Sequence, residues 1–364
     1  MQTVHVNLGE RSYDILIGGN LVPTFGGHVG AAGFGGSPTI VISDSNVAPL
    51  YAEKVLAQLQ ELGCKAELAT VPAGEPSKCS ERLVELWGRA IDAGLDRNSF
   101  VVALGGGVVG DLAGFVAGSF LRGVRFVQVP TSLLSMVDSA VGGKTGINLP
   151  QGKNLIGAFH QPSLVLADLD VLQTLPVREF AAGMAEVIKY GVIYDADLFA
   201  FLESNVDAIK SLDRAAMTHL VQRSCEIKAE VVEQDEREGG LRAILNYGHT
   251  LGHAIEKVTE YKRFLHGEAI AIGMVYASIL SEEICGLPQA ASDRQAELFR
   301  AFDLPVSCAD LDWDGLREAM SVDKKAANSI PKYVLAESVG KVNLPVAVPE
   351  AALKNAWTAL NQRA

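Results

Sequence analysis

The sequence has 364 residues, of which 48% are hydrophobic and 20% are charged, and it carries 36 glycines and a formal net charge of -12. This composition is typical of a globular protein of about two domains, and it excludes a disordered or fibrous chain. The negative charge and the lack of a long basic run argue against nucleic acid or an anionic membrane as a partner. They do not exclude a local basic pocket.

Nothing in the sequence indicates a targeting or membrane-spanning segment. Residues 1–14 alternate like a strand and lack the apolar core of a signal peptide, and the longest apolar run, 269–280, is too short to cross a bilayer. The five cysteines are scattered and form no CxxC pair. These features predict a reduced, cytoplasmic protein.

Short β-rich runs alternate with helical runs in the first half of the chain. Strands are expected at 39–44, 66–71, 100–104, 125–130 and 164–168, and helices at 49–62 and 78–93. This alternation predicts an α/β fold with a parallel sheet. Long amphipathic runs then follow at 178 to past 237, 245–260, 266–285 and 291–302. We therefore predict two domains, an α/β domain over residues 1–177 and a mainly helical domain over 178–364.

The strand at 100–104 runs into a glycine-rich turn and then into a helix. Gly105, Gly107 and Gly110 fit the pattern GxGxxG, whose backbone N–H groups and helix N-terminus suit a pyrophosphate. The turn lies about a hundred residues into the chain and no acidic residue follows about twenty positions later, so the ordinary dinucleotide fingerprint is not met. Asp44, at the end of the strand 39–44, could instead hold a ribose hydroxyl, or it could cap the next helix.

Two lysines, Lys144 and Lys153, directly follow glycines. A third, Lys189, lies on the same helical face as a glutamate. Lys144 and Lys153 suit a phosphate or a carboxylate, although lysines of solvated surface loops are the alternative. Glu186 and Lys189 are three residues apart, so they lie on one face of a helix. A surface ion pair would explain them, but their apolar neighbours indicate a buried setting, in which a carboxylate would need a metal.

Three of the seven histidines lie between residues 249 and 266. Four polar residues, Arg242, Asn246, His249 and His253, step by four, three and four positions, so on a helix they would form one stripe. His249 and His253 can meet one divalent cation, with His266 as the nearest third ligand. Hydrogen-bonded core histidines are the alternative, and the spacing leaves open whether His253 is a ligand or touches substrate. Gly248 and Gly252 indicate that another segment approaches this backbone closely.

Seven motifs resemble those of the 3-dehydroquinate synthase family. They are GGGVVGDLAGF at 105–115, RGVRFVQVPTSLL at 122–134, VDSAVGGKTGIN at 137–148, GKNLIGAF at 152–159, AEVIKYG at 185–191, NYGHTLGHAIE at 246–256 and LHGEA at 265–269. The resemblance implies a Rossmann-like parallel-sheet domain that binds NAD, followed by a mainly helical domain that binds metal and substrate. It further implies a cytoplasmic homodimer that depends on NAD and on zinc, with cobalt as the alternative metal.

The resemblance also implies a role for each residue that matches a family motif. The metal ligands would be Glu186, His249 and His266. NAD would be held by Asp44, Glu75, Lys78, Gly106, Gly107, Val108, Val109, Gly110, Asp111, Thr131, Ser132, Asp138, Lys144, Lys153 and Thr174. The catalytic and substrate-binding residues would be Arg122, Lys144, Asn154, Lys189, Lys228, Arg242, Asn246, His253 and one of Lys324 and Lys325. Arg122 would reach the site of the partner subunit.

The implied reaction converts 3-deoxy-D-arabino-heptulosonate 7-phosphate into 3-dehydroquinate and phosphate, within the shikimate pathway to chorismate and the aromatic amino acids. It proceeds by transient oxidation by NAD, elimination of phosphate, re-reduction and intramolecular aldol closure. Three alternatives stay open: a metal-dependent polyol dehydrogenase, a related cyclase for another sugar phosphate, and a non-catalytic NAD-binding protein. The dehydrogenase would not need so many lysines directed at phosphate, and the binding protein would not need the metal residues.

Overall fold

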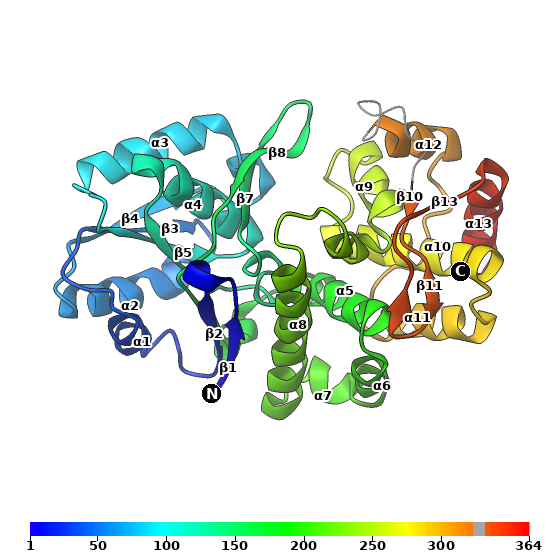
Figure 1. Ribbon diagram of the computed structural model, residues 1–364, viewed down its shortest axis with the longest axis horizontal. Coiled ribbons are helices and arrows are strands. Elements are labelled where there is room, and N and C mark those ends of the chain that lie inside the picture. The colour runs from blue at the N-terminus through cyan, green and yellow to red at the C-terminus, as the bar shows by residue number, and fades with distance from the viewer. Residues whose placement is uncertain (323–331, 364) are drawn as a thin grey trace. The chain divides into compact units, whose positions relative to one another are not determined.

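The structure is a computed structural model of the chain, and it describes residues 1–322 and 332–363 (Figure 1). The chain divides into two compact units. Unit 1 comprises Met1–Leu175 and Met217–Glu233, and unit 2 comprises Pro176–Ala216 and Gln234–Ala364. The predicted domain division after residue 177 stays a prediction, because contacts within one chain do not show which part folds independently.

Unit 1 is built on a seven-stranded sheet with the strand order β1-β2-β9-β6-β5-β3-β4. Its strands are β1 (Gln2–Val6), β2 (Tyr13–Gly18), β3 (Thr39–Asp44), β4 (Ala66–Val71), β5 (Phe100–Gly105), β6 (Arg125–Pro130) and β9 (Leu164–Asp168). β1 runs antiparallel to β2, and the other neighbouring strands run parallel. β5 and β9 are buried along their whole length, as expected for strands that are covered on both faces. The predicted parallel sheet is confirmed.

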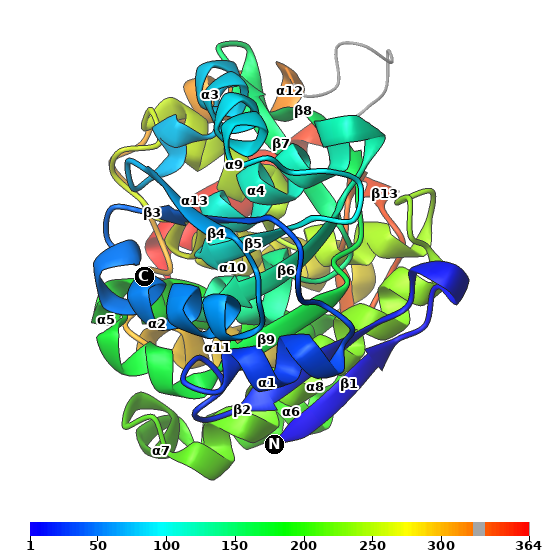
Figure 2. The same ribbon diagram turned by 90° about the vertical axis from the view of Figure 1, so that its left-hand side faces the viewer.

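Helices cover both faces of this sheet. α3 (Ser80–Asp92) and α4 (Gly107–Ser119) lie on one face, and α1 (Phe25–Ala31) and α2 (Ala48–Glu61) lie on the other (Figures 1 and 2). On the first face, Ile40, Val101 and Phe126 of the strands form one buried core with Leu83 of α3 and Leu112 of α4. The short helical turns of this unit are η1 (Gly9–Arg11), η2 (Glu75–Ser77), η3 (Phe120–Arg122), η4 (Ser135–Ser139) and η5 (Leu169–Thr174).

A β-hairpin that the sequence analysis did not predict projects from unit 1 (Figure 1). It consists of β7 (Lys144–Leu149) and β8 (Gly152–Phe159), which pair antiparallel. A Cβ on Gly157 would lie 2.1 Å from the carbonyl oxygen of Thr145, so glycine is required for the two strands to approach. Leu155, Ile156 and Phe159 are apolar but 44–55% exposed. The hairpin therefore lacks the alternation of apolar and polar residues that identifies a half-buried strand in a sequence.

The second half of the chain is mainly helical, as predicted. Its helices are α5 (Val177–Ile193), α6 (Ala196–Ser204), α7 (Val206–Lys210), α8 (Arg214–Gln234), η6 (Leu241–Asn246), α9 (His249–Val258), α10 (His266–Cys285), α11 (Gln289–Ala301), α12 (Trp313–Val322) and α13 (Glu350–Gln362). Two short antiparallel pairs complete unit 2, β10 (Lys332–Tyr333) with β13 (Val346–Ala347) and β11 (Ala336–Ser338) with β12 (Lys341–Val342).

α10 is the central helix of unit 2. It packs against α5, α9, α11 and α13, and nearly all of its residues up to Ser281 are buried. A helix that is apolar all round can be stable in water only when other elements surround it in this way. Within the described residues, none of the helices combines the length and the apolar character that crossing a membrane requires.

Candidate active site

Three helices of unit 2 bring Glu186, His249 and His266 together. Glu186 lies in the middle of α5 and is 1% exposed, whereas His249 and His266 are the first residues of α9 and α10. Oε1 of Glu186 lies 3.4 Å from Nε2 of His249 and 3.6 Å from Nε2 of His266. Nitrogen and oxygen ligands about 2.1 Å from a tetrahedral zinc ion lie about 3.4 Å apart. The Glu186 oxygen therefore lies from each histidine nitrogen as two ligands of one such cation do, and all three ligand atoms lie within 4.8 Å of one another.

Close backbone contacts hold these helices at this distance. A Cβ on Gly267 would lie 1.9 Å from the carbonyl oxygen of Ala182, one turn before the buried glutamate of α5. A Cβ on Gly273 would lie 2.1 Å from the carbonyl oxygen of Gly248. Only glycine allows such approaches. The prediction of a segment close to Gly248 and Gly252 is confirmed, and that segment is α10.

The second nitrogen of each histidine ring also has a partner. Nδ1 of His249 lies 3.1 Å from the carbonyl oxygen of Tyr247, and Nδ1 of His266 lies 3.3 Å from Oε2 of Glu256. When Nδ1 donates its hydrogen to these acceptors, Nε2 is the nitrogen left on the side of Glu186, where a metal would replace its hydrogen. Both rings are thus oriented as metal ligands. The sequence analysis did not single out either Tyr247 or Glu256.

The charges around Glu186 keep its carboxyl group ionised. Burial raises the pKa of Glu186, but the Lys189 ammonium and hydrogen bonds from the two histidines outweigh this effect and hold the pKa well below its usual value. Lys189 forms an ion pair with Oε2 of Glu186, and both side chains are almost fully buried. Burial lowers the pKa of His266, but hydrogen bonds to Glu186 and Glu256 raise it to about 10. At neutral pH a metal would therefore meet an ionised Glu186 and would displace a proton from His266.

The predicted polar stripe is wrong in its first half. Gly248 has a φ of +77°, and this left-handed residue separates the 3-10 helix η6 from α9. Only His249 and His253 therefore share the α9 helix, which begins later than predicted. The exposed ring of His253 has its centroid 5.3 Å from that of His249 and 5.9 Å from that of His266. His253 thus lies beside the two candidate histidine ligands.

Arg242 and Asn246 belong to η6, which packs against α5. Arg242 is 2% exposed, its backbone N–H donates to Oδ2 of Asp235 at 2.9 Å, and its Nη1 donates to the carbonyl oxygen of Glu236 at 2.6 Å. Asn246 is exposed and donates to Oε1 of Glu238 at 3.1 Å. A folded turn, and not a continuous helix, therefore positions both residues.

In unit 1 the strand order changes direction between the neighbouring strands β3 and β5. Ligands of open parallel sheets bind outside the carboxyl ends of the strands at such a point. β3 ends at Asp44, and β5 runs through the glycine turn into α4, which begins at Gly107. Oδ1 of Asp44 accepts hydrogen bonds from the backbone N–H groups of Asn46 and Val47, at 2.8 and 3.1 Å. These bonds close the turn before α2, whose N-cap residue is Val47 and has no side-chain cap, and the ribose contact of Asp44 stays a prediction.

A hydrogen-bond network around the buried Lys78 joins predicted NAD residues to a predicted substrate residue. Lys78 is 4% exposed, and its Nζ donates to Oδ2 of Asp111 at 2.6 Å and to Oδ1 of Asn154 at 2.5 Å. Asn148 donates to Oε1 of Glu75 at 2.7 Å and accepts from the backbone N–H of Asn154 at 2.9 Å. Burial raises the pKa of Asp111, and the Lys78 ammonium opposes that shift. Asn148 was missed because a single asparagine in a strand has no spacing signal.

The remaining predicted residues of unit 1 are also placed. Lys228 donates to Oδ1 and to the carbonyl oxygen of Asp138, at 2.6 Å each, and the hydroxyls of Thr174 and Tyr51 lie 2.6 Å apart. Arg122 is exposed in η3 with a φ of +70°. Thr131 and Ser132 follow β6, Lys144 begins β7, Lys153 lies in β8, and Gly106, Val108, Val109 and Gly110 lie at the start of α4. Lys324 and Lys325 lie outside the described residues.

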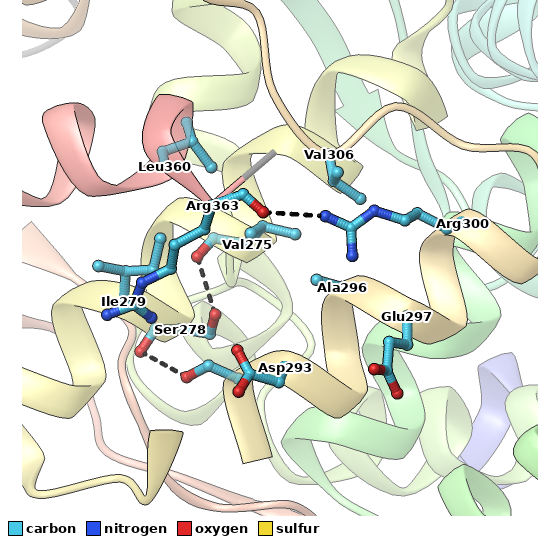
Figure 3. Close-up of a pocket in the computed structure, with 11 residues that line it drawn as sticks. Val275, Ser278, Ile279, Asp293, Ala296, Glu297, Arg300, Val306, Leu360 and Arg363 are labelled. Atoms are coloured by element: carbon cyan, nitrogen blue, oxygen red, sulfur yellow. Dashed lines mark hydrogen bonds between the residues drawn. The ribbon is translucent and has the colours of Figure 1, made fainter. Parts of the chain in front are cut away.

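A cavity of about 110 Å³ lies elsewhere in unit 2, among α10, α11 and α13 (Figure 3). Arg300 donates across it to the carbonyl oxygen of Arg363, whose guanidinium forms an ion pair with Glu282. The residues that line it include none of the predicted metal or substrate residues. The cavity is a packing feature of the chain's last helix and does not belong to the candidate site.

Sequence models of two domains match the chain in succession. The 3-dehydroquinate synthase N-terminal model matches residues 68–182, and the C-terminal model matches residues 183–326. A 3-dehydroquinate synthase of Pelobacter propionicus is 51% identical over 340 residues, which cover 93% of this chain and 94% of that protein. The chain belongs to the 3-dehydroquinate synthase family. Another 3-dehydroquinate synthase, of Desulforamulus reducens, is 48% identical over 96% of this chain and 98% of its own length.

Solved structures agree with membership of the 3-dehydroquinate synthase family. A 2-epi-5-epi-valiolone synthase from Streptomyces hygroscopicus subsp. jinggangensis 5008, solved with NAD+ and Zn2+, has a TM-score of 0.89 and 28% identity and covers 98% of this chain and 99% of its own. A 2-deoxy-scyllo-inosose synthase complexed with carbaglucose-6-phosphate, NAD+ and Co2+ has a TM-score of 0.87 and 28% identity, over 97% and 98%. Glycerol dehydrogenase from Schizosaccharomyces pombe, with a TM-score of 0.68 and 17% identity over 96% and 88%, shares the fold.

Proposed function

We propose that this chain catalyses the conversion of 3-deoxy-D-arabino-heptulosonate 7-phosphate into 3-dehydroquinate and phosphate, as a carbon–oxygen lyase. The proposal is carried by the group of Glu186, His249 and His266 beside the buried Lys189, in a chain that is 51% identical to a 3-dehydroquinate synthase. The substrate carries a phosphate, a carboxylate and an alcohol to be oxidised. Cationic side chains suit the first two groups, and a Lewis acid suits the third.

NAD and a divalent metal are the cofactors of this proposal. Glu186, His249 and His266 would hold the metal, which when bound polarises the hydroxyls of the substrate while NAD removes a hydride and returns it within one turnover. We propose zinc, because the spacing of the three ligand atoms suits it, and Co2+ is the alternative. The unit 1 residues at the end of β3 and the start of α4 would hold NAD.

Several polar side chains would bind and orient the substrate. Arg242 is buried and can offer a planar fork to a carboxylate, whereas the exposed ring of His253 can exchange a proton with a bound substrate at a ring nitrogen. Lys228 and Asn154 would have to share the hydrogen bonds that they make with Asp138 and Lys78. Lys144, Lys189 and Asn246 complete the proposed substrate set, with one of Lys324 and Lys325.

We further propose a homodimer in which Arg122 reaches the active site of the partner subunit. Its exposure and its left-handed backbone, next to the exposed Leu121, support a role outside its own packed core. We also propose a cytoplasmic location, which the five free cysteines support.

The test is an assay of phosphate release from 3-deoxy-D-arabino-heptulosonate 7-phosphate, with and without added NAD, on metal-loaded protein. We expect release that depends on NAD, with many turnovers per NAD and no steady NADH absorbance. NADH accumulating in proportion to substrate, without phosphate, would identify a polyol dehydrogenase instead. Faster release from another sugar phosphate would identify one of the related cyclases, whose folds match with TM-scores of 0.87 and 0.89.

A further inference from the structure

Glu256 is a buried carboxylate in the last turn of α9. It is 3% exposed and lies seven residues after His249, so two helical turns place both side chains on the same face. A carboxylate at this depth is costly unless it is paired. Oε2 of Glu256 lies 3.3 Å from Nδ1 of His266, at the start of α10.

The two nitrogens of the His266 ring face two different carboxylates. Nε2 lies 3.6 Å from Oε1 of Glu186, and Nδ1 lies 3.3 Å from Oε2 of Glu256. A metal-bound imidazole keeps one hydrogen and gives its other nitrogen to the metal, so the acceptor at Nδ1 decides which nitrogen binds. Oε2 of Glu256 is placed to accept the hydrogen of Nδ1, which leaves Nε2 as the nitrogen for the metal.

We propose that Glu256 is a positioning residue of the metal site, which orients His266 and fixes its tautomer without touching the metal. This inference rests on the proposed ligand set of Glu186, His249 and His266. His249 has a weaker counterpart of the same device, since its Nδ1 faces the neutral carbonyl oxygen of Tyr247 at 3.1 Å. Outer carboxylates of this kind strengthen metal binding, and their loss costs about 10- to 100-fold in metal affinity.

A second cation is the competing explanation, because His253, Glu256 and His266 also bring ligand atoms within 4.8 Å of one another. His266 would then have to bind one metal through each nitrogen, and its ring would have to lose both hydrogens. His253 is also exposed, which suits a group that meets substrate. A positioning role needs only the neutral ring and explains the burial of Glu256.

The decisive experiment compares Glu256→Ala, Glu256→Leu and Glu256→Gln by zinc dissociation constants from chelator competition and by the visible spectrum of the cobalt-loaded protein. We expect the first two variants to bind zinc about 10- to 100-fold more weakly and to change the cobalt spectrum. Gln keeps an acceptor oxygen, so Glu256→Gln should recover most of the affinity. Glu260→Gln removes one charge four residues later from an exposed side chain and is the matched control, with wild-type affinity expected.

Each outcome decides the inference. Wild-type affinity in Glu256→Leu would overturn it and leave Glu256 as a packing residue. Two zinc ions per wild-type chain, with one lost in Glu256→Ala, would overturn it in favour of the second cation. If Glu256→Ala does not fold when metal-free, as judged by its thermal melting, Glu256→Leu decides because it keeps the volume. Glu186→Ala tests the ligand set separately, because full zinc occupancy in that variant would reject the proposed site whatever Glu256 does.

Discussion

A carboxylate as buried as that of Glu186 persists as an anion because Lys189 and two histidines surround it. The desolvation of an isolated carboxylate would cost far more than one ion pair returns, and a metal would add a further positive charge at the same atom. Single residues of the candidate site thus depend on one another. Burial likewise determines the hydrogen bonding of Arg242 and the reactivity of the cysteine thiols.

Replacing Arg242 by lysine should impair substrate binding. The guanidinium already donates to the carbonyl oxygen of Glu236, and a lysine cannot keep that bond and also offer two parallel donors to a carboxylate. A lost charged hydrogen bond costs about 1.5–3 kcal/mol, so kcat/KM should fall by about 10- to 100-fold with unchanged zinc content. Steady-state kinetics of Arg242→Lys test this, with the exposed Arg237→Lys as control. Equal kinetics in both variants would remove Arg242 from the substrate site.

The cysteines should differ in reactivity according to burial. Burial raises the pKa of Cys225 and of Cys308 to about 12, so at pH 8 only about one thiol in ten thousand is the reactive thiolate. Iodoacetamide at pH 8 should therefore label the partly exposed Cys79 and Cys285 first. Labelling of the two protected thiols should rise with pH toward 12, provided that the fold persists, and should be complete in guanidinium. Peptide mass spectrometry measures each site, and early labelling of Cys225 would contradict this burial.

At the scale of elements, the positions of the candidate ligands His249 and His266 depend on where α9 and α10 begin. Glu268 accepts a hydrogen bond from the backbone N–H of Leu265 at 2.8 Å and is held by Arg178, which fixes the start of α10 at His266. The contact between Gly248 and Gly273 fixes the start of α9 against the same helix.

Gly273→Ala should therefore separate these helices. The new Cβ would lie 2.1 Å from the carbonyl oxygen of Gly248, and overpacking of this kind costs about 1–3 kcal/mol. We expect a lower melting temperature and weaker zinc binding, because His249 follows Gly248 directly. Gly88→Ala, in an exposed part of α3 with open space at the Cβ, should be neutral or stabilising by up to about 1 kcal/mol. A wild-type melting curve for Gly273→Ala would show that α9 and α10 can adjust.

The sequence predicts regular elements well and the turns between them poorly. β3, β4, β6, β9 and α10 have the predicted limits, because apolar runs mark a buried strand or helix at both ends. The predicted stripe that included Arg242 was wrong because its helical spacing of three and four residues continues through Gly248, whereas the helix itself is interrupted there. Glu256 and Asn148 were not found, because their contacts depend on how the chain folds back and follow no spacing in the sequence.

At the scale of the whole molecule, the proposed sharing of Arg122 between subunits makes a quantitative prediction. Arg122→Ala and Glu186→Ala should each be inactive. Refolded together in equal amounts, half of the randomly formed dimers are mixed, and each mixed dimer has one intact site and one doubly damaged site. About a quarter of wild-type activity should therefore return. If mixed dimers form and no activity returns, Arg122 acts within its own subunit.

The chain also passes between the two units three times, and two of these crossings lie within the single helix α8. A helix of 21 residues is about 30 Å long and continuous in its hydrogen bonding, so its central part, residues 217–233, cannot be detached from its ends. Lys228 lies in that part and pairs with Asp138. A recombination event at one junction near residue 177 would consequently deliver unit 1 without residues 217–233. Exchange between relatives is therefore expected to preserve the two halves as one inherited block, without shuffling them as separate modules.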